Sequence, residues 1–431
     1  MFVLLSLTVQ VPLAVFLGHF YDDRVFMATG YLVSSGFNPY APHFFSGVFP
    51  VAVISGVIPS IGYPPPYPLL LGVIYRASYA LTQNIFLYNF AIKIPVIIAD
   101  IGLAYLVRHI LVERQVSQKK AQIAFLLILF NPLILLTTVA WGEIDSLIAV
   151  ISVAALYLLT KSKVALCAVL FGVAVALKPI ALPLAAVPLL FVSPAITTKT
   201  RFMYLGLFFA TFLGLYFGPF FLAGWRIPLG GSQWDVQVQM SGGMTLFDFL
   251  DIFQPKSILP ASISFLGFMW IPALLITYFV VFRRRPSNVN DLAKMGIVVM
   301  LVFFLTRTWV SEPNVNMILP LILLVASSGG LKLRNFHLAW LLPMAFMFPN
   351  SSFQQLFYLV DPSIMAWLLQ INAQYGELRF LAQVVVVSLW ELFALKMISQ
   401  MLRKPQTQGP EDLAKNENVN PLAHLLQWFF A

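Results

Sequence analysis

The sequence has little charge and almost no cysteine. Only 10% of its 431 residues are Asp, Glu, Lys or Arg, whereas 60% are hydrophobic and 15% aromatic. Soluble globular chains carry about 25% charged residues, so this composition excludes a water-soluble enzyme, a disordered protein and a nucleic-acid binder. The single cysteine, Cys167, lies in an apolar run, which excludes a disulfide framework or a thiolate metal site within one chain. Lipid is therefore expected to be the main solvent of this protein.

Signals for secretion and for histidine-based metal binding are also missing. The apolar run Phe2–Phe20 has neither a basic segment before it nor a small-residue cleavage site after it, so we expect a retained first span and no signal peptide. The five histidines are scattered along the chain. They predict no metal cluster.

Apolar runs separated by charged residues predict the membrane spans. A helical span needs about 20 apolar residues. The expected spans are Phe2–Phe20, Phe86–Val107, Ile123–Ala140, Leu147–Thr160, Val164–Leu177, Ile180–Val192, Phe202–Ala223, Ser262–Phe282, Ile297–Leu305, Val315–Ser327, Phe336–Phe348 and Leu381–Ile398. The expected fold class is an all-α integral membrane protein with about 12 transmembrane helices, several of them short enough to be tilted or half-spanning.

The net charge is +9, and the positions of the charged residues along the chain indicate which loops face the cytoplasm. If the N-terminus is cytoplasmic and each run crosses once, most of the 26 Lys and Arg residues fall in cytoplasmic connections and most of the 17 Asp and Glu residues fall outside. Basic residues collect in cytoplasmic loops of membrane proteins. We therefore expect both termini in the cytoplasm. The protein itself would lie in the plasma membrane of a prokaryote or in the endoplasmic reticulum of a eukaryote.

Residues 21–85 form a long outer loop after the first span. The loop is aromatic and rich in proline, notably at Tyr63–Pro68, and long ordered loops are usually functional. Its apolar segment Tyr67–Leu81 is expected to lie along the membrane as an interfacial or re-entrant helix. Residues 1–404 would form one polytopic domain, with 405–431 as a cytoplasmic tail ending in an interfacial segment.

Acidic residues follow two of the expected spans on the outer side. Asp22 and Asp23 come directly after the first span, and Glu143 and Asp145 lie in the sequence Trp-Gly-Glu-Ile-Asp-Ser at 141–146. Polar groups near hydrocarbon are costly and are usually functional. Two simpler interpretations stay open: the first pair can merely end a span, and the second group can cap a helix N-terminus.

Two cations occupy comparable outer positions. Lys178 precedes Pro179, which breaks a helix, and a cation between half-helices is costly unless an anion meets it. A phosphate or a carboxylate suits that role, and snorkelling to lipid headgroups is the alternative. Arg307 is a second phosphate candidate, although it can also pair with nearby Glu312.

Four motifs join these residues. They are Gly36-Phe37-Asn38-Pro39-Tyr40, Asn131-Pro132, Trp141-Gly142-Glu143-Ile144-Asp145-Ser146 and Ala176-Leu177-Lys178-Pro179. With an acid after the first span, they resemble the GT-C class of polytopic membrane glycosyltransferases. The pattern is most similar to archaeal and bacterial polyprenyl-phosphate-sugar-dependent transferases that share Trp-Gly-Gln-x-Asp-Ser and Leu-Lys-Pro. The resemblance is strongest over residues 21–188.

The resemblance implies a GT-C-like fold with an outward-facing site. It also implies a polyprenyl-phosphate sugar donor and an Asp of the first outer loop as catalytic base. That base falls on Asp22 or Asp23, and Asp23 is the first choice because Phe26 follows it and Arg24 can hold its carboxylate ionised. Glu143 departs from the pattern, since Gln is more usual there.

The expected function is therefore transfer of a sugar, mannose by the resemblance, from a polyprenyl (dolichyl-type) phosphate to a hydroxyl of a lipid or glycan acceptor. Lys178 and Arg307 would bind the donor phosphate, and Glu143, Asp145 and Glu312 would bind the acceptor or support the site. The acids also offer oxygen ligands to Mg²⁺ or Mn²⁺. The expected partners are the two substrates and membrane lipids, without nucleic acid. The alternative function is a multi-pass transporter or a glycolipid flippase.

Overall fold

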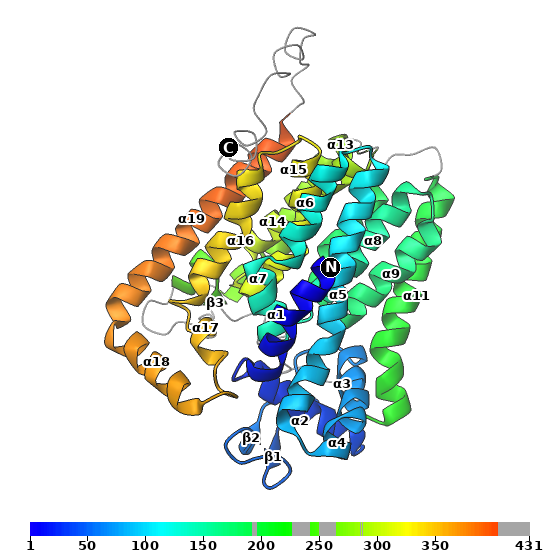
Figure 1. Ribbon diagram of the computed structural model, residues 1–431. Coiled ribbons are helices and arrows are strands. Elements are labelled where there is room, and N and C mark those ends of the chain that lie inside the picture. The colour runs from blue at the N-terminus through cyan, green and yellow to red at the C-terminus, as the bar shows by residue number, and fades with distance from the viewer. Residues whose placement is uncertain (192–195, 226–241, 250–263, 285, 287, 404–431) are drawn as a thin grey trace.

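The computed structural model describes residues 1–191, 196–225, 242–249, 264–284, 286 and 288–403. Most of these residues are helical. Long helices run side by side in one bundle, and the elements of residues 21–85 gather at one end of it (Figure 1). The tail predicted at 405–431 lies outside the described residues, as do small parts of the runs 180–192 and 262–282.

The main helices of the bundle coincide with the expected apolar runs. They are α5 (Ile85–Glu113), α6 (Gln118–Leu129), α8 (Asp145–Thr160), α9 (Val164–Leu177), α11 (Thr198–Ala223), α13 (Trp270–Arg284), α14 (Val289–Thr306), α15 (Leu319–Ser327), α16 (Leu333–Met347) and α19 (Gly376–Leu402). Within the described residues, 6 segments are long and apolar enough to cross a membrane. The integral membrane class is supported, and the larger number of spans stays a prediction.

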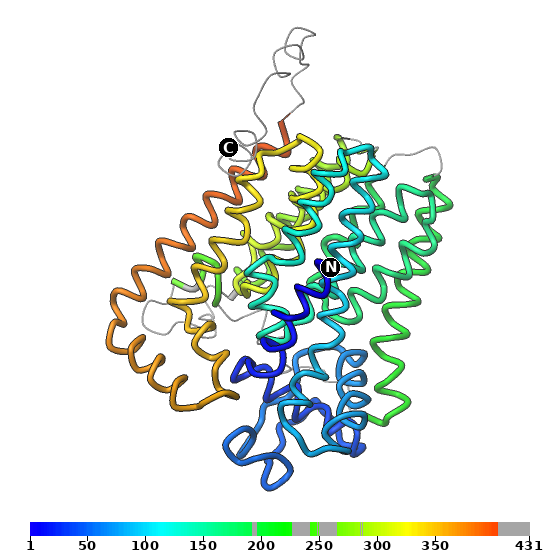
Figure 2. Tube along the Cα trace, viewed as in Figure 1, coloured from blue at the N-terminus to red at the C-terminus, as the bar shows by residue number. Residues whose placement is uncertain are grey.

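The first helix is shorter than its apolar run. α1 covers Phe2–Phe16, 15 residues, which at 1.5 Å per residue extend about 22 Å, less than the roughly 30 Å of bilayer hydrocarbon. In Figure 2 the N-terminus begins part-way along the bundle. The amide of Asn89 on α5 donates to the carbonyls of Ala14, at 2.9 Å, and Leu17, at 2.8 Å. These bonds satisfy carbonyls that the end of the helix leaves open.

The loop 21–85 is folded into a small layer. It contains α2 (Asp22–Ser34), β1 (His43–Phe45), β2 (Gly56–Ile58), α3 (Pro66–Ala77) and α4 (Tyr79–Thr82). β1 and β2 pair antiparallel with Phe44 opposite Val57. The helix expected at 67–81 is present as α3 and α4, separated at Ser78, whose backbone is not helical. α2 packs on α3 and is a helix that hydropathy alone did not predict.

Two interruptions of the bundle shape the region between loop and helices. Asn131 caps α7 (Pro132–Ile134) by accepting bonds from the backbone N–H groups of residues 133 and 134, and a π-helix, η1 (Leu135–Ala140), continues to Trp141. The second break is at Lys178, which ends α9 in an extended conformation before Pro179. The predicted helix break at Pro179 is confirmed.

The remaining described elements are short. They are η2 (Pro179–Ala181), α10 (Leu182–Ala186), η3 (Val187–Leu190), β3 (Gly242–Gly243), η4 (Leu246–Phe249), η5 (Ser264–Phe268), β4 (Trp309–Val310), η6 (Glu312–Met317), α17 (Ser352–Gln355) and α18 (Pro362–Gln374). β3 and β4 pair in parallel. The two sheets found among the described residues have two strands each, so helix packing determines the architecture.

Candidate functional site

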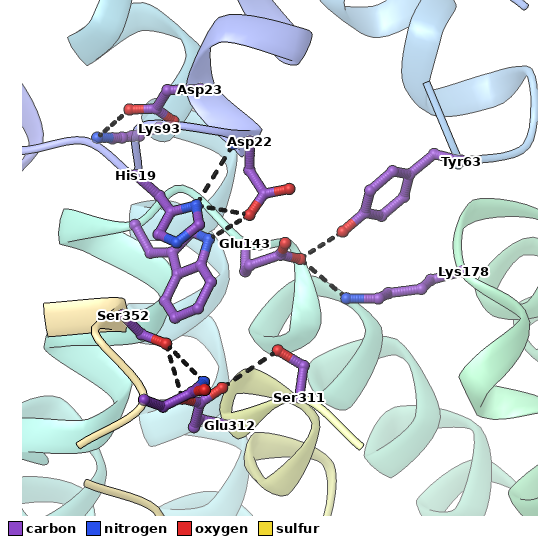
Figure 3. A network of polar contacts seen from close by, with 12 residues as sticks. His19, Asp22, Asp23, Tyr63, Lys93, Glu143, Lys178, Ser311, Glu312 and Ser352 are labelled. Carbon is purple, nitrogen blue, oxygen red and sulfur yellow. Dashed lines mark hydrogen bonds and ion pairs between the residues drawn. The ribbon is translucent and has the colours of Figure 1, made fainter. Parts of the chain in front are cut away.

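Asp22, in the first turn of α2, lies against an aromatic pair. Its Oδ2 accepts a hydrogen bond from Trp141 Nε1 at 2.8 Å and lies 2.9 Å from His19 Nδ1 (Figure 3). The His19 and Trp141 rings stack with centroids 4.0 Å apart. Burial raises the pKa of Asp22, but His19, the Trp141 bond and Lys178 together lower it below the usual value. Because its pKa is lowered, this carboxylate is ionised. It is also accessible, since the side chain is 22% exposed.

Asp23, the neighbouring acid, is buried in an ion pair. Its Oδ2 lies 3.2 Å from Lys93 Nζ, and both side chains are fully buried. Figure 3 shows Asp23 turned toward Lys93. Burial raises the pKa of Asp23 to about 7, against the opposing effect of Lys93. Asp23 was the first choice for the base, and the structure encloses it away from solvent.

The expectation that Arg24 holds Asp23 ionised is wrong. Arg24 Nη2 donates to the carbonyl of Ser55 at 3.2 Å, and the guanidinium lies over the Phe20 ring. Lys93 is the cation that contacts Asp23. Adjacent positions on a helix point about 100° apart, so Arg24 and Asp23 face different elements.

Glu143, Asp145 and Lys178 form a second charged cluster. Lys178 Nζ lies 2.9 Å from Glu143 Oε2 and 2.6 Å from Asp145 Oδ2. The phenol of Tyr63 donates to Glu143 Oε2. The Lys178 ammonium lies 5.2 Å from the centroid of the Tyr63 ring. The anion expected at Lys178 is therefore a pair of carboxylates. Snorkelling is wrong, because the Lys178 side chain is only 16% exposed and points into the protein.

The cluster changes how its members titrate. Burial raises the pKa of Glu143 to about 7, with Lys178 lowering it and Asp22 and Asp145 raising it. Burial alone would lower the pKa of Lys178, but the two carboxylates raise it above its usual range. Burial and the neighbouring acids keep the Tyr63 phenol protonated, with its pKa well above 10. Glu143 is therefore the member whose charge changes near neutral pH.

Asp145 begins α8 and is fully buried. Its Oδ1 accepts a hydrogen bond from Asn314 Nδ2 at 3.1 Å, and no side chain caps this helix. The interpretation of the acidic loop as a side-chain cap is thus wrong. Instead the carboxylate ties Lys178 to η6.

Glu312 belongs to a separate, enclosed polar group. Its Oε1 accepts bonds from Asn350 Nδ2 at 2.9 Å and Ser352 Oγ at 2.8 Å, and the residue is 1% exposed. Arg307 does not pair with Glu312; within the described part of the chain its guanidinium has no acidic partner and lies over the Phe303 ring. Burial lowers the pKa of Arg307 to about 10, so it stays cationic.

The structure thus brings Asp22, Glu143 and Lys178 together (Figure 3), with Asp145 paired to Lys178. It leaves Asp23 and Glu312 buried beside them. Three contributors were not predicted as site residues. His19 and Tyr63 gave only weak signals, as a lone histidine and as part of an aromatic, proline-rich run. Lys93 did give a signal, because a lysine within an apolar span is costly unless it has a partner.

The carboxylates do not form an evident metal site. Among the described residues, no three His, Cys, Asp or Glu side chains are grouped so that they could hold a metal ion. The Lys178 ammonium contacts both Glu143 and Asp145 and already supplies the positive charge that a cation would bring. The described residues therefore give no support to the expected Mg²⁺ or Mn²⁺.

Residues 8–195 match the model of a protein family described as alpha-(1->6)-mannopyranosyltransferase, N-terminal domain. The N-terminal part of this chain is mannosyltransferase-like. The match covers a little under half of the chain and includes every residue of the Asp22 and Lys178 clusters except Asn314. Over these residues the chain is similar to a mannosyltransferase domain, which agrees with the resemblance carried by its motifs. A comparison with curated proteins found no match.

Proposed function

We propose that the protein transfers a mannosyl group from a polyprenyl-phosphate mannose donor to a hydroxyl of a glycan or lipid acceptor at the outer face of the membrane. The observation that carries the proposal is the accessible Asp22 carboxylate, held ionised by His19 and Trp141 beside the Glu143–Lys178 cluster. The family description suggests the 6-hydroxyl of a mannose residue as the acceptor and an α linkage as the product.

In this proposal Asp22 is the general base. Its carboxylate takes the proton of the acceptor hydroxyl while that oxygen attacks the anomeric carbon of the donor. The bond from this carbon to the phosphate oxygen breaks, and polyprenyl phosphate leaves with the electron pair. The leaving group is a stable anion, so the step needs no dedicated general acid. A single base acting in one displacement predicts inversion at the anomeric carbon.

The Lys178 cluster suits the acceptor better than the phosphate. Lys178 contacts two carboxylates, so the group is not a cationic site, and an approaching phosphate would meet negative charge. Carboxylates and the Tyr63 ring instead suit sugar hydroxyls and the apolar face of a sugar ring. Both substrates would then be held in a geometry suited to reaction, which can lower the barrier by several kcal/mol.

The donor phosphate is assigned to Arg307. Its guanidinium has no acidic partner within the described part of the chain, and its planar array of donors matches phosphate oxygens. No step is assigned to a divalent cation, because the Lys178 ammonium already lies between the Glu143 and Asp145 carboxylates.

The proposal is tested with purified protein in lipid nanodiscs. The protein receives radiolabelled undecaprenyl- or dolichyl-phosphate mannose and a synthetic α-mannoside, and the product linkage is determined by NMR. We expect a (1→6)-linked product, no product with GDP-mannose as the donor, and unchanged yield in EDTA. Product from GDP-mannose alone would overturn the donor assignment.

Transport is the alternative outcome. If the same protein moves labelled polyprenyl-phosphate mannose across a proteoliposome membrane and forms no glycosidic product with any acceptor, the transferase proposal is overturned. The Asp22→Asn variant is the matched control, because it should lower transfer by about 10²- to 10⁴-fold and leave donor binding intact.

A further inference from the structure

Lys93 is a fully buried lysine near the outer end of α5, outside the proposed chemistry. Its ammonium donates to the carbonyl of Leu17 and to that of Ala140, the latter at 2.7 Å, and lies 3.2 Å from Asp23 Oδ2. An ammonium has three N–H donors, and two of them bond to these carbonyls. Lys93 is thus a buried cation held by two backbone carbonyls and by an ion pair with Asp23.

The three partners of Lys93 lie on three separate segments, each of which carries a site residue. Leu17 follows the end of α1 and precedes His19 by two positions, whereas Ala140 ends η1 and precedes Trp141. Asp23 is adjacent to Asp22 in the first turn of α2. The negative ends of two helices also favour a cation at this point. One ammonium therefore connects the three segments that carry Asp22, His19 and Trp141.

Two glycines allow the backbones to close around the Asp23 carboxylate. A Cβ atom at Gly18 would lie 2.0 Å from Asp23 Oδ2, and one at Gly142 would lie 2.9 Å from Asp23 Oδ1. Gly142 also has a φ of +98°, a conformation that favours glycine. The chain before α2 and the loop that carries Glu143 consequently approach the same carboxylate from two sides.

We infer that Lys93 is a positioning residue for the proposed reaction. Through Leu17, Ala140 and Asp23 it fixes the spacing between the 19–23 turn, which holds the base, and the 140–143 loop, which holds Trp141 and Glu143. Displacing a catalytic group by about 1 Å can cost about 100-fold in rate. The inference rests on the proposed function, because it assigns Lys93 a role through Asp22 and Glu143.

The test removes the ammonium without shortening the side chain. Lys93→Met should lower kcat about 100-fold and change both KM values less than about threefold. Because Lys93→Met leaves Asp23 buried without its cation, the neutral double variant Lys93→Met/Asp23→Asn is measured beside it. We expect the double variant to recover thermal stability while kcat stays low. A double variant with wild-type kcat would overturn the inference.

A second comparison separates positioning from a general structural role. In an Asp22→Asn background the base is already absent, so adding Lys93→Met should lower the residual rate no further. A full additional 100-fold loss in that background would overturn the inference. Asn89→Leu is the control, since Asn89 lies one turn earlier on α5 and donates only to carbonyls at the end of α1; it should lower thermal stability with little effect on kcat.

The two hypotheses fail in different ways. A wild-type protein that forms no product with any donor contradicts the proposed function. An active wild type with Lys93→Met at full kcat contradicts only the positioning role. If Asp22→Asn keeps full activity, the base assignment is wrong, and the inference that Lys93 acts through Asp22 is overturned with it.

Discussion

Asp22 and Asp23 are consecutive residues whose carboxylates have different surroundings. The first is 22% exposed and is bonded to Trp141 and His19, whereas the second is fully buried against Lys93. Successive residues of a helix point about 100° apart, so the first turn of α2 directs one acid to the site and the other into the bundle. The same residue type is thus placed for chemistry at one position and for structure at the next.

This separation predicts opposite consequences for two equivalent substitutions. Asp22→Asn should lower kcat by about 10²- to 10⁴-fold, the usual contribution of a general base, with little change in thermal stability. Asp23→Asn should destabilise the protein by about 3–5 kcal/mol, because removing one partner leaves the other buried charge unpaired. Melting curves and single-turnover rates of both variants test this. The reverse pattern would make Asp23 the base.

Glu143→Gln tests the role of a carboxylate with a raised pKa. The pKa of Glu143 rises from 4.5 to about 7 in the folded protein, so between these values the folded state holds a proton that the unfolded state has released. The stability contributed by this proton is complete below pH 4.5 and is lost as the pH rises to about 7. Glu143→Gln should therefore flatten the decline of melting temperature over this interval.

The same variant should keep transferase activity. A protonated carboxyl and an amide have similar shapes, and the resemblance to related transferases places Gln at this position. We expect kcat within about tenfold of wild type and no transition in rate near pH 7. A loss comparable to that of Asp22→Asn would instead place Glu143 in the chemical step.

Lys178→Met tests the assignment of the acidic cluster to the acceptor. The substitution removes the cation between Glu143 and Asp145, so the two acids would repel each other and the loop would shift. We expect the acceptor KM to rise about tenfold or more and the donor KM to change little. Arg307→Met is the matched comparison and should raise the donor KM instead. A larger effect of Lys178→Met on the donor KM than on the acceptor KM would indicate that Lys178 binds the donor phosphate.

Cysteine labelling tests the orientation in the membrane. Suitable positions for a single cysteine are exposed. Val57→Cys is at a site 67% exposed, and Lys163→Cys is at an exposed turn between α8 and α9. Position 145 is fully buried and would not react. The native Cys167 is buried and should react slowly. An impermeant maleimide applied to intact cells should label position 57 and not 163. Labelling of position 163 alone would show that the protein has the opposite orientation in the membrane.

Much of the fold follows from local patterns. Apolar runs predicted where the helices lie, and Pro179 predicted an interruption that the structure contains. Hydropathy overestimated α1, because it measures solvent preference and does not register that Asn89 and Lys93 satisfy carbonyls where the helix ends. It also missed α2, whose buried face depends on packing against α3.

The candidate site divides in the same way. The sequence by itself determined a membrane environment, and it brought attention to Asp22, Asp23, Glu143, Asp145 and Lys178 as charges too costly to be incidental. Only the tertiary structure decided their partners: Lys93 pairs with Asp23, and Lys178 pairs with Glu143 and Asp145. These contacts join residues between 33 and 70 positions apart. Such pairings depend on how helices pack, whereas the cost of burying each charge can be read from the residue alone.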